Sequence, residues 1–389
     1  MKKTIFIITG LCILLQWGCR LEELELECAE QGFEEKYNNG LNRLYAADAI
    51  ETSDGKFIIC AASITDGNIY FIESDKDGSV NFIENEQVEA GVSSIVSTPD
   101  NGFIICGTRS QMAYFAKYSR EGVLQSDVVG LAGNCNDIIH VSGQRFAFAG
   151  RQLSDSPYAG IIDLNDTLIS ISNEYKPSNA PRARTNAIIY SSETNEYILI
   201  GQSHLNMTMG GMNNVLNDLH FYKLNSSMDL LFEVAHSVGT TNDVGRDIVQ
   251  TDDGNYMVIG QTVNAGRKAM ILKMNIAGNI LDTFQYQGLD ITDGYAITKG
   301  HNSNEYIIVG ETRTSTPNSK QQIYAAKINE NNGELVWARF FGETMFDERA
   351  FSVISTSDCG YLVTGFEGVN VNNAIKAFII KLDENGNIQ

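Results

Sequence analysis

The sequence predicts an all-β protein, a seven-bladed β-propeller of four-stranded antiparallel blades. Three observations lead to this prediction. A similar segment recurs along the chain, each copy has the pattern of short strands joined by tight turns, and the N-terminal part supplies a strand that the last copy lacks. Repeats of about 40 to 50 residues are typical of propellers, which close such units into a ring.

The first 18 residues have the layout of a secretory signal. Lys2 and Lys3 precede an apolar run over residues 5–15, which is too short to span a membrane. Residues 15–19, LQWGC, resemble a lipobox, which implies that Cys19 is the lipidated first residue of the mature protein. An ordinary signal peptide cleaved nearby is the alternative.

An acidic tether is expected over residues 19–31, where residues 20–27 read RLEELELE. This stretch resembles the acidic export tags of surface-exposed lipoproteins in Bacteroidota. It implies an outer-membrane lipoprotein that is exposed at the cell surface or faces the periplasm, and a solvated linker is the alternative. We therefore expect a signal peptide over 1–18, the tether over 19–31 and the propeller over 32–389.

Residues 33–39 are expected to form the outer strand of the last blade. The last copy ends just after its third strand, whereas other copies continue into a fourth strand such as residues 333–342. Near the start of the mature chain, residues 32–40 have a similar pattern with no strand before them. Pairing the two ends of the chain in this way would leave no unpaired edge between the first and last blades.

Seven copies of the repeat can be aligned on the small residue that closes the second strand, and these markers are 43 to 59 residues apart. The fifth copy is the clearest, because an Asp-Gly turn at 253–254 precedes one strand over 256–260 and a further strand over 269–274. The apolar run 306–309 is typical of strands covered on both faces. The seven markers are Ala61, Gly107, Gly150, Gly201, Gly260, Gly310 and Gly365.

The pattern D-G-x-Y-hydrophobic-G followed by K-L-D-x-x-G-N resembles the tandem-repeat β-propeller lipoproteins of Bacteroidota. Residues 381–387, KLDENGN, are one instance of its second part. The resemblance covers nearly the whole mature chain, although the third copy has Asp163 in place of the strand lysine and the fourth has long loops. It implies the fold and an envelope location, but that family carries no agreed activity.

The charge of the chain excludes two classes of partner. The formal net charge of the 389 residues is −20, and −22 remains without the first 18 residues. Nucleic acids and anionic lipids are bound through Lys and Arg, so we expect no nucleic acid and a membrane contact through the lipid anchor alone. We expect a monomeric propeller without cofactor or metal, since no H-E-x-x-H or C-x-x-C motif occurs.

Two kinds of recurring residue are expected to be structural. Cys60 and Cys106 occupy equivalent strand positions and are interpreted as small core residues. A lysine also recurs at the end of the third strand, and we expect its stem to pack on a neighbouring strand with its ammonium group in water. These lysines are Lys117, Lys223, Lys273, Lys327 and Lys381.

The fourth copy breaks the repeat pattern with two long loops, over residues 172–184 and 203–217, which are expected on the same face of the propeller. Loops vary while blades hold them rigid, and methionine suits an adaptable apolar contact, so we predict a binding surface here. A soft-metal site from His204 and its methionines, and a loop folded over its own apolar residues, are the alternatives. The predicted ligand-binding residues are Tyr175, Arg182, Arg184, His204, Met207, Met209 and Met212.

These observations favour a non-enzymatic module that binds an envelope protein or an extracellular glycan. The alternatives are an enzyme acting on polysaccharide through paired carboxylates, and a passive scaffold in an envelope complex. For the enzyme, Asp243, Asp293 and Asp347 begin inner strands but recur in several copies, which favours a structural role.

Two weaker signals complete the prediction. Arg246, Arg313 and Arg349 come from loops, or the edges of loops, on the predicted binding face and could complement an acidic ligand. Residues 166–168, Asp-Thr-Leu, match the pattern that Bacteroidota envelope proteins use for O-glycosylation.

Overall fold

The computed structural model describes residues 32–37, 43–86, 88–164, 168–171, 175, 182–209, 212–238, 242–263, 266–284, 291–313, 320–331, 334–343, 346–369 and 374–388. All regular elements in these ranges are β-strands, as the sequence predicts. A search of the same ranges finds no helix with the length and apolar character needed to cross a membrane.

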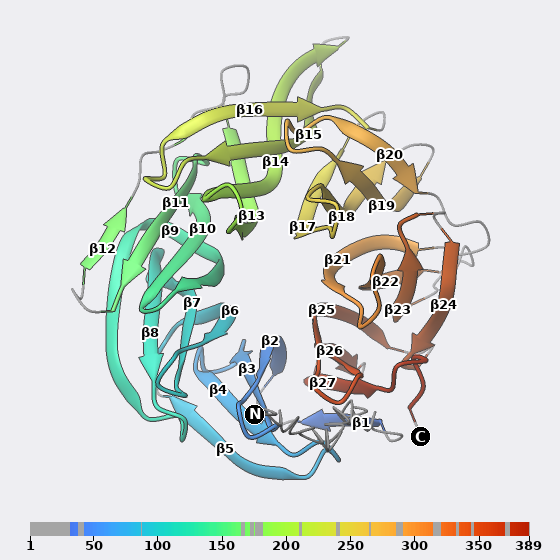
Figure 1. Ribbon diagram of the computed structural model, residues 1–389. Coiled ribbons are helices and arrows are strands. Elements are labelled where there is room, and N and C mark those ends of the chain that lie inside the picture. Colours follow the sequence, from blue (N-terminus) through green and yellow to red (C-terminus); the bar gives the residue numbers. More distant parts are fainter. Residues whose placement is uncertain are drawn as a thin grey trace, which may run out of the picture.

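The strands form six antiparallel sheets arranged in a ring as a β-propeller (Figure 1). Four of the sheets each consist of four strands that follow one another along the chain. Their strands are β2 (Leu44–Glu51), β3 (Phe57–Ser63), β4 (Ile69–Ser74) and β5 (Val80–Glu86); β13 (Arg182–Ser191), β14 (Glu196–Met209), β15 (Met212–Leu224) and β16 (Leu230–His236); β17 (Val244–Gln250), β18 (Tyr256–Val263), β19 (Arg267–Met274) and β20 (Ile280–Phe284); and β21 (Ile291–Lys299), β22 (Glu305–Arg313), β23 (Gln321–Asn329) and β24 (Glu334–Phe341).

The structure has six sheets where the sequence predicts seven separate blades, because one sheet has seven strands. Its strand β9 is 19 residues long and continues from the stack of β6–β8 into that of β10–β12. At the junction Gly133 has a φ of 144°, and a Cβ atom there would lie 2.1 Å from the carbonyl oxygen of Arg151, so only glycine fits. The strands are β6 (Gly91–Ser97), β7 (Phe103–Arg109), β8 (Met112–Tyr118), β9 (Leu124–Ser142), β10 (Arg145–Gln152), β11 (Pro157–Asp163) and β12 (Leu168–Ile171).

The sixth sheet joins the two ends of the chain. β1 (Phe33–Tyr37) pairs antiparallel with β27 (Ala374–Leu382), which continues into β26 (Tyr361–Val369) and β25 (Asp347–Ser355). The predicted closing strand is thus confirmed over residues 33–37. Phe33 is buried against the neighbouring sheet, so closure also buries an apolar side chain.

A β-bulge recurs in the innermost strand of every copy of the repeat and explains the small marker residues. The marker glycine of the second strand lies opposite the bulge, where the backbone approaches closely. A Cβ atom on Gly260 would lie 1.9 Å from the carbonyl oxygen of Val244, and one on Gly365 would lie 1.8 Å from that of Arg349. The residues in the bulges are Ala47, Ser93, Asn136, Asn186, Arg246, Tyr295 and Phe351.

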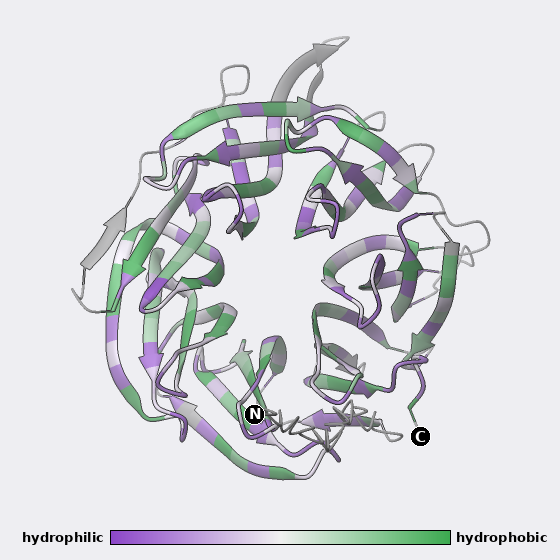
Figure 2. Ribbon diagram, in the orientation of Figure 1, coloured by the Kyte–Doolittle hydropathy of each residue, from purple (hydrophilic) through white to green (hydrophobic). Residues whose placement is uncertain are grey.

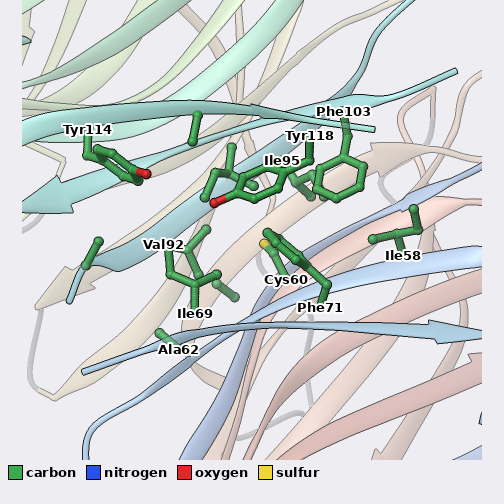
Figure 3. Packing of buried hydrophobic residues seen from close by; sticks show 14 residues of the cluster. Ile58, Cys60, Ala62, Ile69, Phe71, Val92, Ile95, Phe103, Tyr114 and Tyr118 are labelled. Carbon is green, nitrogen blue, oxygen red and sulfur yellow. The ribbon is translucent and has the colours of Figure 1, made fainter. Parts of the chain in front are cut away.

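The core lies between neighbouring sheets. Figure 2 shows hydrophobic residues along the strands and many hydrophilic ones in the turns, and Figure 3 shows one cluster in which Phe71, Phe103 and Tyr118 pack around Cys60. Phe71 makes edge contacts with Phe103 and Tyr118, at centroid distances of 4.9 and 4.6 Å. Cys60 and Cys106 are buried and free, which confirms their interpretation as core residues.

The recurring lysines are structural but not in the predicted way. Each pairs with an acidic residue near the start of the second strand of its own sheet, and three of the lysines are buried. The prediction that the ammonium groups lie in water is therefore wrong for Lys223, Lys327 and Lys381, because a buried ammonium requires a charged partner. The pairs, with N–O distances from 2.5 to 3.1 Å, are Lys117–Asp100, Lys223–Glu196, Lys273–Asp253, Lys327–Glu305 and Lys381–Asp358.

Candidate functional site

Arginines gather at one end of the propeller, where the innermost strands begin and the second strands end. We call this end the arginine face and the opposite end, which carries most of the Asp-Gly and Asn-Gly turns, the lower face. Of the twelve arginines in the described ranges, Arg120, Arg145 and Arg339 lie at or near lower-face turns. The other nine are at the arginine face: Arg43, Arg109, Arg151, Arg182, Arg184, Arg246, Arg267, Arg313 and Arg349.

Three of these arginines surround a single carboxylate in a group that we call the Asp155 cluster. Asp155 lies in the turn between β10 and β11. Arg151 is near the end of β10, and its guanidinium nitrogen lies 3.0 Å from Asp155 Oδ1. Arg182 and Arg184 reach the same carboxylate from the start of β13, at 3.7 and 3.6 Å. Among the described residues, one carboxylate faces three guanidinium groups, which leaves an excess of positive charge in this part of the cluster.

His204 joins the Asp155 cluster from β14, where it pairs across the strands with Arg182. Burial and the Arg184 charge lower the pKa of His204, and burial and the Arg151 charge lower the pKa of Arg184. The buried Nε of Arg184 has no hydrogen-bond partner among the described residues, whereas Asn217 lies beside the ring of His204. The Arg184 Nε–H could donate a hydrogen bond to an anion, which would also offset the excess charge.

A second group of charges, the mouth cluster, lies around the starts of β17, β21 and β25. Asp293 is fully buried and accepts from Arg246 at 3.3 Å and from Arg267 at 2.5 Å. The buried carboxylate of Glu311 pairs with Arg349 at 2.6 Å. Three arginines and two acids again leave positive charge at the rim of the central channel.

The channel below this rim has a ring of aspartates that connect the copies of the repeat. Each follows a bulge and accepts a backbone N–H from the next inner strand: Ile95 to Asp48 at 3.0 Å, Ile188 to Asp137 at 2.9 Å and Ile297 to Asp247 at 2.8 Å. Burial raises the pKa of all three, that of Asp137 to about 6 and that of Asp247 to about 7. We refer to them as the seam aspartates.

The seam aspartates line a cavity of about 480 Å³, whose other walls include Ser94, Ser352 and isoleucines of the inner strands. Ser94 Oγ lies 3.1 Å from Asp48 and 3.2 Å from Asp137. These hydrogen bonds give the buried carboxylates a structural role. In the described part of the chain, no group of three or more His, Cys, Asp or Glu side chains has an arrangement that could hold a metal ion.

The structure brings together three of the predicted ligand-binding residues, Arg182, Arg184 and His204. Tyr175 does not join them, because its ring is buried beside Tyr222 and its hydroxyl donates to the carbonyl oxygen of Met228. The side chains of Met207, Met209 and Met212, the lipidation site Cys19 and the residues Asp166 and Thr167 lie outside what the structure describes.

The other carboxylates and arginines singled out in the sequence also have defined places. Asp243 is buried and accepts from Val238 N and Thr262 Oγ1, both at 2.6 Å. Asp293 is in the mouth cluster, and Asp347 pairs with Lys320 at 2.9 Å. Arg246 and Arg349 enter the mouth cluster, whereas Arg313 is exposed nearby.

Sequence reasoning missed Arg151, Asp155, Arg267 and Glu311. All four lie at or beside the turns that join second and third strands, which reach the arginine face like the loops that the sequence singled out. The sequence did contain a signal for such a cluster. Arg151, Arg267 and Arg313 lie at the edges of these turns, although the chain as a whole is strongly acidic.

Comparison with known proteins identifies the fold but no family. No protein-family model and no curated protein matches the chain. Among solved structures, a catalytically inactive variant of virginiamycin B lyase from Staphylococcus aureus, with quinupristin, is similar with a TM-score of 0.57 and 13% identity over 90% of this chain and 100% of that one. The Dos1 propeller is similar with a TM-score of 0.51 and 8% identity over 86% and 77% of the two chains. Identities this low support the propeller fold alone.

Proposed function

We propose that this protein is an exported, lipid-anchored, non-enzymatic binding module whose arginine face takes an anionic ligand. The Asp155 cluster is the observation that carries the proposal. Among the described residues, three arginines share one carboxylate and the buried Nε of Arg184 lacks a hydrogen-bond partner, in a chain with a net charge of −20. Arginine binds carboxylate, phosphate and sulfate groups in a bidentate manner, so such a cluster favours an anion.

The burial and the contacts of the candidate carboxylates favour binding over catalysis. A general acid or base needs an oxygen that can reach a substrate. Asp293 is fully buried between two arginines, Asp243 is buried with hydrogen bonds to both of its oxygens, and Asp347 is ion-paired with Lys320. These contacts suit structural roles, whereas the arginines of the Asp155 cluster are exposed or half-buried.

We also propose that the seven-stranded sheet consists of two blades, so that the propeller has seven repeats. β9 pairs with β8 over residues 124–132 and with β10 over residues 133–142, so each half serves a different stack. The seven equivalent bulges support the same count.

Export and anchoring rest on the signal-like residues 1–18 and on Cys19, with two structural features in support. Cys359 is disulfide-bonded, and disulfides persist mainly in oxidising compartments outside the cytosol. Phe33 pairs with Lys381 at the lower face, so the chain enters the propeller from the side opposite the arginines. An anchor at Cys19 would then leave the arginine face directed away from the membrane.

The test is affinity electrophoresis of residues 32–389 through gels that contain polygalacturonate, alginate or polyglutamate. We expect at least one polyanion to retard the protein at low salt, and retardation to weaken at high salt because charge screening grows. The double variant Arg182→Ala, Arg184→Ala should lose the retardation.

The matched control is Arg145→Ala, which removes an exposed arginine from the lower face. It should be retarded like the unchanged protein. Equal retardation of both variants, or no retardation by any of the polyanions, would refute the proposed function.

A further inference from the structure

Aromatic side chains interrupt the repeat at the rim of the central channel. Tyr295 and Phe351 are the residues in the bulges of β21 and β25, and Tyr45 lies near the start of β2. Phe351 meets Tyr295 edge-on at a centroid distance of 5.7 Å and Tyr45 at 6.1 Å. All three side chains are half-buried, so they form a continuous rim surface that we call the aromatic platform.

Other bulge residues show what a purely structural residue does at this position. Asn136 donates to the carbonyl oxygen of Thr185 and Asn186 to that of Gly245, both at 2.6 Å, so each amide ties its strand to the next one. The residue in the bulge differs from copy to copy, and the rings of Tyr295 and Phe351 make no such polar link there. Because the repeat fixes no residue type at this position, the fold does not require the aromatic platform, and its partly exposed rings are free to contact a ligand.

Arginines border the aromatic platform. The guanidinium group of Arg246 lies over the ring of Tyr295, at 5.0 Å from the centroid. That of Arg349 lies over Phe366, whose ring is 5.5 Å from Phe351. The rings meet at 82° and 77°, so the platform is an angled apolar surface. One of its rings, beside guanidinium groups, can contact the C–H groups of a sugar ring that carries a carboxylate at its edge.

One inner strand, β17, separates the Asp155 cluster from this platform around the ring. Arg182 and Arg184 belong to β13, and the Asn186 link joins β13 directly to β17, which carries Arg246. Excess positive charge thus extends over neighbouring inner strands on one face. Two separate groups of arginines on one face suit a polymer with several negative charges better than a single small anion.

We propose that the arginine face binds an acidic polysaccharide built from hexuronate units. One pyranose ring packs on Tyr295 and Phe351 with its carboxylate at Arg246 or Arg349, and a unit further along the polymer places its carboxylate at Arg182 and Arg184. This assignment rests on the proposed function and adds the chemical class of the ligand.

The experiment is calorimetric titration of residues 32–389 with hexagalacturonate and with hexamannuronate. The methyl ester of hexagalacturonate tests the need for the carboxylates, and hexaglutamate tests an acidic peptide as the alternative. We expect one of the two uronate hexamers to bind, and its affinity to fall at least tenfold in Tyr295→Leu and in Phe351→Leu. Leucine keeps apolar bulk but removes the flat ring, and circular dichroism and melting curves would establish that each variant is folded.

Phe340→Leu is the matched control, because Phe340 is an exposed aromatic residue on the outer strand β24. It should bind like the unchanged protein. A uronate hexamer that is lost with Arg182→Ala, Arg184→Ala but kept by both platform variants would overturn the platform and leave the proposed function standing. Hexaglutamate or the methyl ester binding as tightly as the uronate would overturn the glycan class, and failure of every acidic probe would overturn both proposals.

Discussion

The glycine that closes the second strand in six copies of the repeat faces a carbonyl oxygen across a β-bulge. This contact gives a physical reason for a residue that the sequence presents only as a pattern. At Gly201 and Gly260 a Cβ atom would lie 1.9 Å from backbone oxygen, which neither partner can relieve without moving a strand. The bulge also places the next side chain toward the channel, so the glycine and the seam aspartates follow from one backbone feature.

We expect Gly260→Ala to destabilise the protein by about 2 kcal/mol, because overpacking against backbone is not easily relaxed. Gly91→Ala is the control, since a Cβ atom there would meet nothing closer than 4.0 Å. It should change stability by less than about 0.5 kcal/mol. Urea unfolding measures both, and equal losses would contradict the steric explanation.

Among the elements, the five-residue strand β1 joins the two ends of the chain in one sheet. Five residues of β1 pair with β27, and Lys36 pairs with the buried carboxylate of Glu367 at 2.5 Å. Without β1, β27 would become the outer strand of its sheet, and its backbone groups would form a new open edge at the place where the two ends of the chain meet. Such edges pair readily with other chains.

A chain that begins at residue 43 should therefore melt at a lower temperature than one that begins at residue 32. Burial of Phe33 alone is worth about 2 kcal/mol. The shorter chain should also self-associate, which light scattering after size exclusion would detect. If both chains melt at the same temperature and both are monomeric, closure by β1 contributes nothing to stability.

The sequence predicted those elements whose signals are local. Turn glycines and apolar runs indicated the hairpins, and the missing last strand indicated the pairing of residues 33–37. The continuity of β9 was not predictable in this way, because the spacing of copies does not tell whether a loop or a strand joins them. Arg182 and His204 were found from the length of the fourth copy, but the structure places them in β13 and β14 and not in the predicted loops, because β14 and β15 continue as a long hairpin over residues 203–217. Asp155 was missed because its contact with them joins different copies.

At the scale of the whole molecule, the seam aspartates connect inner strands through carboxylates that line the central cavity. Their raised pKa values mean that the folded protein binds protons more tightly than the unfolded chain. The stabilisation from this effect is complete below about pH 4 and is lost as pH rises through 6 to 7. These carboxyl groups thus make the ring less stable in neutral than in mildly acidic solution.

We expect Asp247→Asn to reduce the loss of stability between pH 5 and pH 8 by about 2 kcal/mol. Asparagine still accepts from Ile297 N but does not titrate in this range. Urea unfolding at the two pH values measures the difference, and the exposed Asp282→Asn is the control. A pH dependence unchanged by Asp247→Asn would exclude this group as a source of the effect.

The position of β1 also determines how the molecule would carry a mechanical load. Residue 32 enters at the lower face, whereas the proposed ligand lies at the arginine face. Tension between an anchored N-terminus and a held ligand would run along β1, pulling it lengthwise past β27. The hydrogen bonds of all five residue pairs would then resist together in shear, whereas a pull across the strand would break them one after another. The strand that closes the ring is thus oriented to withstand force from a ligand attached to a moving surface.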